Sequence, residues 1–461
     1  MKATKRELAF AREYFGEVRH TTLNPDSPGV VRIHFVPPKE DYEGGQLYPG
    51  VAIINGQDVI PVNLAWSVLL TALIAEINRY SGQPINEQET GIIVDNACSA
   101  VKKVYPLVSR GRLRRDIFRI MNTFGNIARG LEPQEDIDYI PLGDYAPLMK
   151  APHRMDLLVS SMSKNGAWHC NQKCVHCYAA GQEAAGEAEL PTAEWKNIID
   201  KCRAAGIPQV TFTGGEPTMR DDLPELIEYA GWFVTRLNTN GIKLTKDYCK
   251  KLKEASLDSL QITFYSCDEK IHNALVGADG FRYTAAGIDN ALAAGLNLSI
   301  NTPLCTMNRD YVRTLEYLNE KGVIYVTCSG LITTGNAAGE ESGALQLTGD
   351  EMKETLREAV DYCFSHGMEI SFTSPGWVSE DFCRELGITV PTCGACLSNM
   401  AVTPGGNVVP CQSWLSGPSL GKITECSWEE IWNSRECVER RRFSAEAAGI
   451  CPLRVKGGRN G

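Results

Sequence analysis

The stretch that decides the fold is Cys170-Asn171-Gln172-Lys173-Cys174-Val175-His176-Cys177. It places three thiols at the spacing C-x3-C-x2-C, and it follows an apolar run at 155–162 that we expect to form a strand. Iron–sulfur clusters are held by thiolates on short segments of this kind. Three buried free thiols are the alternative, but a polar segment is not a packing pattern for cysteine. The stretch therefore predicts a cluster held by Cys170, Cys174 and Cys177, with one iron of a four-iron cubane left open.

Length and charge narrow the class of protein. The chain has 461 residues, enough for two or three domains. Its formal net charge of −10 argues against a nucleic-acid partner, because binding nucleic acid requires a basic surface. Two short basic runs, 110–119 and 440–442, are expected to be solvated helix faces; the alternative is a docking patch for an acidic peptide or an acidic electron donor.

The 17 cysteines bear on the compartment. The N-terminus shows no apolar signal-peptide region. The longest apolar stretch, 64–77, contains Glu76 and is too short to span a bilayer. We therefore expect a cytoplasmic protein without a membrane partner, whose cysteines are ligands or free thiols rather than disulfides.

Three regions differ in their pattern. Residues 1–150 show strands at 30–36 and 51–54 followed by apolar helices, which predicts a small α+β module and a linker. Residues 151–375 alternate strands with helices, and repeated βα units predict a parallel α/β sheet. Residues 376–461 form a third, cysteine-rich domain.

A second motif follows the cysteine stretch. Gly214-Gly215-Glu216-Pro217 comes after the apolar strand 210–212, and its two glycines allow a close backbone approach to a ligand. An ordinary turn is the alternative for these four residues alone. A third motif, Leu237-Asn238-Thr239-Asn240-Gly241, lies at the end of the next strand. The three motifs in this order resemble the radical S-adenosylmethionine (radical SAM) superfamily over about residues 153–450.

The resemblance implies a fold and two cofactors. The fold is a partial six-stranded (βα) barrel of the TIM type, with the chemistry at the carboxyl ends of the strands. In this family SAM binds the open iron of a 4Fe-4S cluster, is cleaved by one electron, and yields a radical that abstracts hydrogen from a substrate. The resemblance assigns no catalytic side chain. The residues expected to bind SAM are Gly214, Gly215, Glu216, Pro217, Asn240, Thr263, Tyr265 and Asn301.

One segment departs from the family pattern. Many members carry Ser-Leu-Asp after the fourth strand, where this chain reads Thr263-Phe264-Tyr265-Ser266-Cys267. The individual SAM contacts on that strand are therefore open.

The C-terminal cysteines predict a second cluster. Cys396, nine residues, Gly406, four residues and Cys411 resemble the opening of the SPASM domain, which holds auxiliary 4Fe-4S clusters. The dense cysteine group of a full domain is missing from the second half, so we expect one auxiliary cluster, as in the shorter twitch form. Its expected ligands are Cys393, Cys396, Cys411 and Cys451. Cys437, Cys426 or an open site are alternatives for the fourth ligand, and a zinc site is the alternative for the group.

The resemblance suggests three functions. The first is maturation of a ribosomally made peptide by crosslinking, epimerisation or another modification, with an N-terminal winged-helix-like module binding the leader; a structural or dimerising cap is the alternative for that module. The second is processing of a tetrapyrrole or haem precursor. The third is a non-catalytic iron–sulfur electron or scaffold protein, which would not need the Gly-Gly-Glu-Pro segment. The expected partners are a peptide or small-molecule substrate and a low-potential flavodoxin or ferredoxin.

Overall fold

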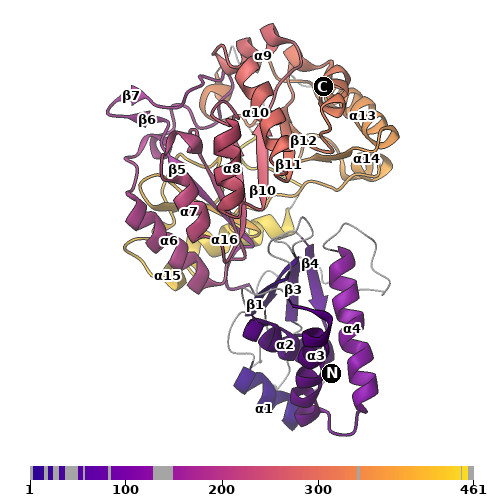
Figure 1. Ribbon diagram of the computed structural model, residues 1–461. Helices are drawn as coiled ribbons and strands as arrows, with labels where there is room; N and C mark the ends of the chain where they lie inside the picture. Colours follow the sequence, from indigo (N-terminus) through magenta and orange to yellow (C-terminus); the bar gives the residue numbers. More distant parts are fainter. Residues whose placement is uncertain are drawn as a thin grey trace. The chain divides into compact units, whose positions relative to one another are not determined.

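The computed structural model divides into two compact units, residues 1–149 and 150–461 (Figure 1). It describes residues 4–14, 19–23, 31–36, 50–54, 58–80, 85–127, 149–339, 343–447 and 449–454. Within these residues no helix is long and apolar enough to cross a bilayer.

The first unit combines an antiparallel sheet with helices. Its strands β1 (Arg19–Leu23), β2 (Val31–Val36), β3 (Gly50–Ile54) and β4 (Asp58–Val62) pair in the order β1-β2-β3-β4. Its helices are α1 (Lys5–Tyr14), α2 (Leu64–Ile77), α3 (Glu87–Val104) and α4 (Arg110–Ile127), with a short 3₁₀ turn, η1 (Asn78–Tyr80), after α2. Since two strands lie at the edges, β1 and β4 each have an unpaired side in the described sheet.

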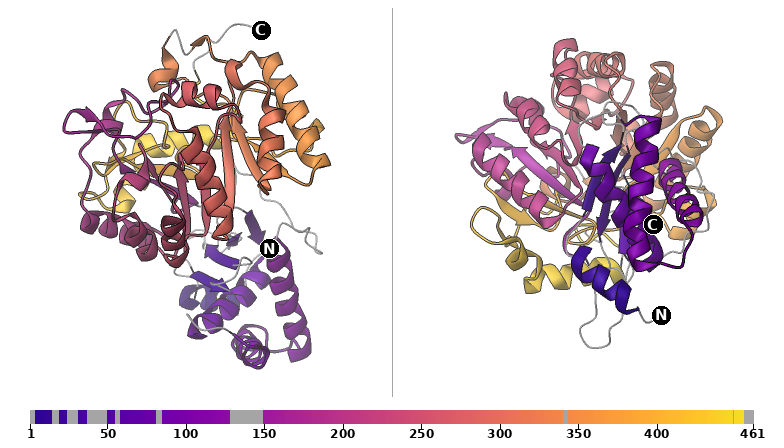
Figure 2. Two further views of the ribbon diagram at one scale, coloured as in Figure 1. Left: turned by 45° about the horizontal axis from the view of Figure 1, so that its top comes forward. Right: turned by 60° about the horizontal axis from the view of Figure 1, so that its bottom comes forward.

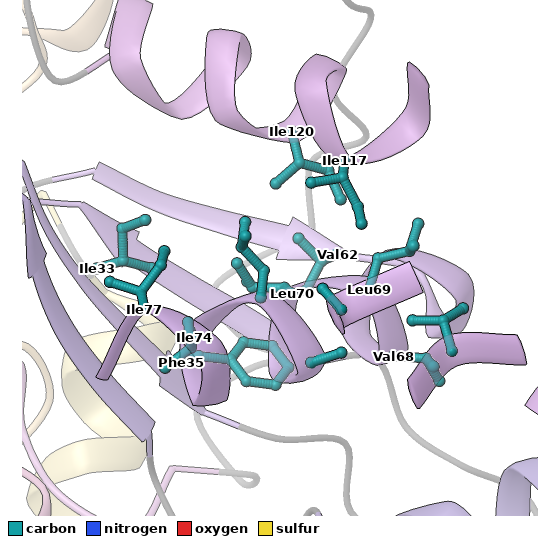
Figure 3. Close-up of a cluster of buried hydrophobic side chains, with 14 of the residues drawn as sticks. Ile33, Phe35, Val62, Val68, Leu69, Leu70, Ile74, Ile77, Ile117 and Ile120 are labelled. Atoms are coloured by element: carbon teal, nitrogen blue, oxygen red, sulfur yellow. The ribbon is translucent and has the colours of Figure 1, made fainter. Parts of the chain in front are cut away.

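Helix α2 is the centre of this unit's core. Asn63 caps its first turn by accepting a hydrogen bond from the backbone N–H of Trp66 at 2.9 Å. Its apolar side chains lie between the sheet and α4, where Phe35 of β2 and Ile117 and Ile120 of α4 join the same cluster (Figure 3). A helix covered on several faces loses its amphipathic pattern, which explains the continuous apolar run in the sequence. The winged-helix-like arrangement stays a prediction.

The second unit is built on one sheet of ten strands, in the order β13-β12-β11-β10-β9-β8-β5-β14-β15-β16. The strands from β13 to β14 in this order are parallel to their neighbours, and β14, β15 and β16 pair antiparallel. The predicted α/β class with a parallel sheet is therefore confirmed. The strands are β5 (Arg154–Ser160), β8 (Gln209–Gly214), β9 (Val234–Thr239), β10 (Ser259–Thr263), β11 (Leu298–Pro303), β12 (Tyr325–Ser329), β13 (Glu369–Phe372), β14 (Asn399–Val402), β15 (Asn407–Val409) and β16 (Gly421–Lys422).

Helices follow most of the parallel strands. Those from α6 to α14 are α6 (Thr192–Ala205), α7 (Leu223–Tyr229), α8 (Lys246–Glu254), α9 (Glu269–Val276), α10 (Phe281–Ala293), α11 (Tyr311–Glu320), α13 (Gly349–Ser365) and α14 (Glu380–Glu385). Two C-terminal helices, α15 (Trp428–Trp432) and α16 (Arg435–Glu446), complete the unit. The short helix α9 lies in a stretch without a predicted helix.

The C-terminal segment continues the same sheet. Strand β14 pairs with β5, so that Met400 lies opposite Met155. The yellow C-terminal segment accordingly lies beside the first strands of the sheet in both views of Figure 2. The domain boundary expected between residues 375 and 376 therefore falls inside one compact unit, and the two-domain division of this unit stays a prediction.

The parallel sheet has one apolar and one polar face. Apolar residues such as Phe212, Leu237 and Ile262 alternate with polar ones and are fully buried. Parallel strands covered on both faces are normally apolar on both. Here the polar face lines a cavity. Its members, which we call the pocket face, are Arg154, Thr211, Thr213, Arg236, Asn238, Gln261, Thr263, Asn301, Thr327, Ser371 and Thr373.

Candidate cofactor and substrate site

A pocket of about 730 Å³ opens over the pocket face. This volume lies within the range of small-molecule and cofactor sites. The three cysteines of the first motif line it, together with every residue expected to bind SAM except Pro217. The structure thus brings the three sequence motifs to one cavity.

The cysteine loop, residues 170–177, is held by two segments far along the chain. The backbone of the loop donates two hydrogen bonds to helix α9, from Lys173 N to Val276 O at 2.9 Å and from Val175 N to Leu275 O at 3.0 Å. On the other side, Asn336 donates from its backbone to Cys177 O at 2.9 Å and from its side chain to Cys174 O at 3.1 Å. The loop conformation is therefore set by tertiary contacts.

Glycines allow both of these segments to approach the loop. A Cβ atom on Gly277 would lie 2.4 Å from Lys173 O, and one on Gly335 would lie 2.4 Å from Tyr178 O. Both glycines also have positive φ angles, +60° and +57°. No other residue type fits either position without moving the backbone of the loop or its flank.

The three thiols of the loop lie in a buried environment. Burial raises the pKa of Cys170 to about 12 and raises the pKa of Cys174 and Cys177 as well. Without a positively charged partner these sulfurs are protonated at neutral pH, so ligand binding must release protons.

The spacing of the donors favours a cluster over a single ion. Among the described residues, no group of three or more His, Cys, Asp or Glu side chains has the spacing to hold one metal ion. A tetrahedral zinc site brings its thiolates to within about 4 Å of one another, because each Zn–S bond is about 2.3 Å. An iron–sulfur cluster carries each thiolate on a different iron and needs wider spacing. Three thiols around one cavity fit such a cluster.

The segment 214–217 joins two strand ends. Gly214 has a φ of +138°, and a Cβ atom there would lie 2.3 Å from Ser160 O. Glu216, only 1% exposed, accepts hydrogen bonds from Thr218 N at 3.0 Å, Thr218 Oγ1 at 2.5 Å and Thr239 Oγ1 at 2.6 Å on Oε1. Its Oε2 accepts one from Asn240 N at 2.8 Å.

These bonds fix the position of Glu216 and determine how many further hydrogen bonds its carboxylate can accept. Burial raises its pKa, and the hydrogen bonds from Thr218, Thr239 and Asn240 oppose that rise. A carboxylate offers about four acceptor sites, two on each oxygen. Since Oε2 uses only one of its sites within the protein, it keeps capacity for an ammonium group in the pocket.

The remaining SAM candidates differ in their partners. Asn240 donates from Nδ2 to Asn171 Oδ1 at 2.6 Å, which ties the end of β9 to the cysteine loop. Asn301 accepts from Thr327 Oγ1 at 2.9 Å, and Thr263 lies beside Asn301 in register. Tyr265 is buried, and its side chain hydrogen-bonds with that of Cys174. It therefore lies against a predicted cluster ligand, a contact that the sequence did not reveal.

The C-terminal cysteines lie in two groups. Cys393, Cys411 and Cys451 line a smaller cavity of about 160 Å³. This cavity shares lining residues such as Leu331, Asn399 and Gln412 with the large pocket. A group bound at these three thiols would thus adjoin the substrate space.

Cys396 lies with Cys437 in the second group. A hydrogen bond joins the two side chains; it lowers the pKa of Cys437 and raises that of Cys396. Arg441, which is 9% exposed, lies 3.6 Å from Cys437 Sγ through Nη1. Cys396 also interacts electrostatically with Cys411, but neither Cys396 nor Cys437 is among the residues that line the small cavity.

One end of the pocket is lined by two arginines, Arg154 and Arg236. The sequence motifs assigned no role to either residue. The available signal was the strand 234–239, in which the long polar side chains Arg236 and Asn238 are two residues apart and face the cavity. The barrel rule directs attention to the carboxyl ends of strands, whereas these arginines lie near the strand starts.

The chain is similar to two families of known proteins. The radical SAM superfamily matches residues 169–336, and the SPASM iron–sulfur cluster-binding domain matches residues 393–452. An AdoMet-dependent heme synthase of Methanosarcina barkeri is 31% identical over 311 residues, which cover 62% of this chain and 85% of that protein. One of Oleidesulfovibrio alaskensis is 29% identical over 300 residues, 61% of this chain and 76% of that protein.

Among solved structures, SuiB of Streptococcus suis, bound to its precursor peptide SuiA, covers 85% of this chain and 87% of its own with a TM-score of 0.56. Its sequence identity is 14%, so the likeness concerns the fold.

The chain belongs to the radical SAM superfamily and carries a SPASM domain at its C-terminal end. It is a radical SAM enzyme whose cofactors are SAM, a SAM-binding 4Fe-4S cluster and an auxiliary iron–sulfur cluster.

Proposed function

We propose that the chain abstracts hydrogen from a substrate held in the 730 Å³ pocket, and that this substrate is a haem precursor. The observation that carries the proposal is the composition of this pocket. The three thiols and the SAM candidates line the same cavity as two arginines, which suit the carboxylates of a porphyrin. The names of the two heme synthase relatives support this substrate class.

Each group of residues has a separate task in this proposal. Cys170, Cys174 and Cys177 hold the first cluster, and Cys393, Cys396, Cys411 and Cys451 hold the auxiliary one. With its cluster, SAM supplies one-electron cleavage of a carbon–sulfur bond and hence a radical that removes hydrogen. The residues of the chain orient and shield it. Glu216 binds the methionyl ammonium, the two glycines admit the backbone, and Asn240, Thr263 and Asn301 position the rest of SAM.

The parallel sheet curves into the partial barrel of the family in this proposal. A low-potential flavodoxin or ferredoxin supplies the electron. A cytoplasmic location, in which thiols stay reduced, is part of the same proposal.

A peptide substrate is the second candidate. The observation that favours it is the separate N-terminal unit, with its own core and with two edge strands, β1 and β4. An edge strand offers unpaired backbone groups to an extended peptide. The structural likeness to SuiB in complex with SuiA agrees with this candidate.

The test compares the two substrates in one assay. Anaerobically reconstituted protein receives reductant, SAM and either Fe-coproporphyrin III or the peptide encoded beside its gene. We expect 5′-deoxyadenosine in both mixtures and a change in mass of the porphyrin alone. A changed peptide with an unchanged porphyrin would favour the second candidate, and no 5′-deoxyadenosine in any mixture would refute the proposal.

A further inference from the structure

We propose that the floor of the large pocket, formed by Arg154, Thr211, Arg236 and Asn238, binds a carboxylate of the substrate. This inference rests on the proposed function and specifies how the substrate is recognised. It concerns the part of the pocket face that no sequence motif reaches.

The strand register puts the floor residues on one face. Thr211 of β8 lies opposite Asp156 of β5 on one side and opposite Arg236 of β9 on the other. Cross-strand neighbours in register point to the same face of a sheet. Asn238, two residues after Arg236, points to this face as well.

The charges of the floor do not balance. Arg154 forms an ion pair with Asp156, with 2.9 Å between Nε and Oδ1. Arg236 forms no ion pair with any carboxylate of the described residues, although Asp156 lies close enough to raise its pKa. Two guanidinium groups thus share one carboxylate, and the floor carries an excess positive charge.

Several polar atoms of the floor also lack partners. Within the described part of the chain, Nε of Arg236 and Oγ1 of Thr211, which can both donate, are buried without a hydrogen bond. Oδ1 of Asn238 is also without a partner; because it is an acceptor, it requires a donor of the bound molecule rather than its carboxylate. Thr211 is 1% exposed and lines the pocket. Buried polar atoms without partners are costly, so such a group of them indicates a bound species. A carboxylate can accept from the guanidinium and the hydroxyl at once.

The floor lies too far from the Glu216 end of the pocket to bind the carboxylate of SAM, so the carboxylate that it binds belongs to the substrate. Arg236 lies four residues before Asn240 on β9, which is about 13 Å along a strand. Glu216 and the cysteine loop are at the Asn240 end. Burial and the neighbouring Arg154 lower the pKa of Arg236 to about 10, and a bound anion would restore its usual value.

The experiment measures binding of two acids and their neutral derivatives to the full-length, anaerobically reconstituted protein. The probes are coproporphyrin III and its tetramethyl ester, and an acidic hexapeptide and its fully amidated form. Variants are Arg236→Met and Arg236→Lys. The matched control is Arg282→Met, which removes the same charge from a surface position whose side chain is 82% exposed.

We expect the wild type to prefer one acid over its neutral derivative by about tenfold to hundredfold, the range for a charge-assisted hydrogen bond. Arg236→Met should lose this preference, Arg236→Lys should keep part of it, and Arg282→Met should equal the wild type. The acid that shows the preference identifies the source of the carboxylate. Iron content and circular dichroism verify that each variant is folded.

Three results would overturn the inference. These are a wild type without preference for either acid, a folded Arg236→Met variant with the wild-type preference, or an Arg236→Met variant that loses affinity for SAM instead. Failure of the proposed function is distinguishable from failure of this inference. A wild type that forms no 5′-deoxyadenosine refutes the proposed function, whereas the preference for an acid is a binding measurement that needs no turnover.

Discussion

Glu216 shows how one buried side chain serves both stability and cofactor binding. Its carboxylate accepts four hydrogen bonds, two from Thr218 and one each from Thr239 at the end of β9 and from Asn240 directly after it. The Gly-Gly-Glu-Pro motif is expected to bind SAM. Here the same carboxylate also links the segment after β8 to the end of β9, so its replacement affects two measurable properties.

We predict that Glu216→Ala destabilises the protein and abolishes SAM cleavage. Orphaning four buried donors should cost about 2–4 kcal/mol. This corresponds to a fall in Tm of roughly 3–6 °C in thermal unfolding of the apo-protein, because the entropy of unfolding scales with the size of the unit 150–461. The control Glu228→Ala, at an exposed position, should leave Tm unchanged. A Glu216→Ala variant with the wild-type Tm would show that these hydrogen bonds carry little net stability.

The auxiliary ligands allow a second prediction at the residue scale. Cys451 lines the small cavity with Cys393 and Cys411, whereas Cys396 and Cys437 interact with each other and do not line it. Cys451→Ser should therefore lower the iron content of reconstituted protein from about eight to about four atoms per chain, and Cys437→Ser should keep about eight. The opposite result for the two variants would assign the fourth ligand to Cys437.

Some residues of the site could be predicted from the sequence and others could not. Local motifs were enough to select residues that meet in one pocket, because cysteine spacing and a Gly-Gly-Glu-Pro turn are short-range patterns. Arg236 and the hydroxyl of Tyr265 gave no such signal. Their roles depend on which residues face them across strands and loops, and that information lies outside any short window.

At the scale of elements, the cysteine loop depends on helix α9 and on the segment at 335–336. Neither was predicted to contact the loop, since the contacts join distant parts of the sequence. The positions of the βα units were predictable from alternation, whereas α9, only eight residues long, was missed. The pairing of β14 with β5 was missed for the same reason of distance.

We predict that Gly335→Ala removes the first cluster and spares the auxiliary one. Its methyl group would lie 2.4 Å from Tyr178 O, so the loop must move. Iron should fall from about eight to about four atoms per chain, and SAM cleavage should be lost. Gly295→Ala is the matched control, because its φ of +65° is as strained but nothing lies within 4 Å of the new methyl group. Equal iron loss in both variants would point to general backbone strain.

The connection after β10 gives a further prediction. The Tyr265 side chain hydrogen-bonds with that of Cys174, and hydrogen bonds to cluster sulfurs raise the reduction potential by stabilising the more negative, reduced state. Tyr265→Phe should therefore lower the potential of the first cluster by about 20–50 mV, the equivalent of a bond worth about 1 kcal/mol or less. Redox titration followed by electron paramagnetic resonance measures the shift. Tyr283→Phe, at a position 62% exposed, should leave the potential unchanged.

At the scale of the whole molecule, the chain has two units with separate cores. The fold class of the second unit was predictable, because its strand–helix alternation repeats many times. The arrangement of the first unit was less so, because its few strands and apolar helices are compatible with several small α+β folds.

We predict that residues 150–461 retain iron and SAM cleavage when produced alone, since the three thiols and all pocket residues belong to this unit. With a porphyrin substrate, activity should persist in the truncated protein. With a peptide substrate bound by the first unit, KM should rise at least tenfold while uncoupled SAM cleavage continues. An insoluble or iron-free fragment would show that the second unit depends on the first.

The double hold on the cysteine loop has a consequence for biosynthesis. Cys174 leaves the ribosome long before Asn336, which follows it by 162 positions and donates to its carbonyl oxygen. During translation the nascent loop thus carries its thiols without the segments that shape it. Insertion of iron and sulfide into the finished geometry must await the sixth parallel strand. Maturation of this centre is accordingly a late event, after most of the chain has been made.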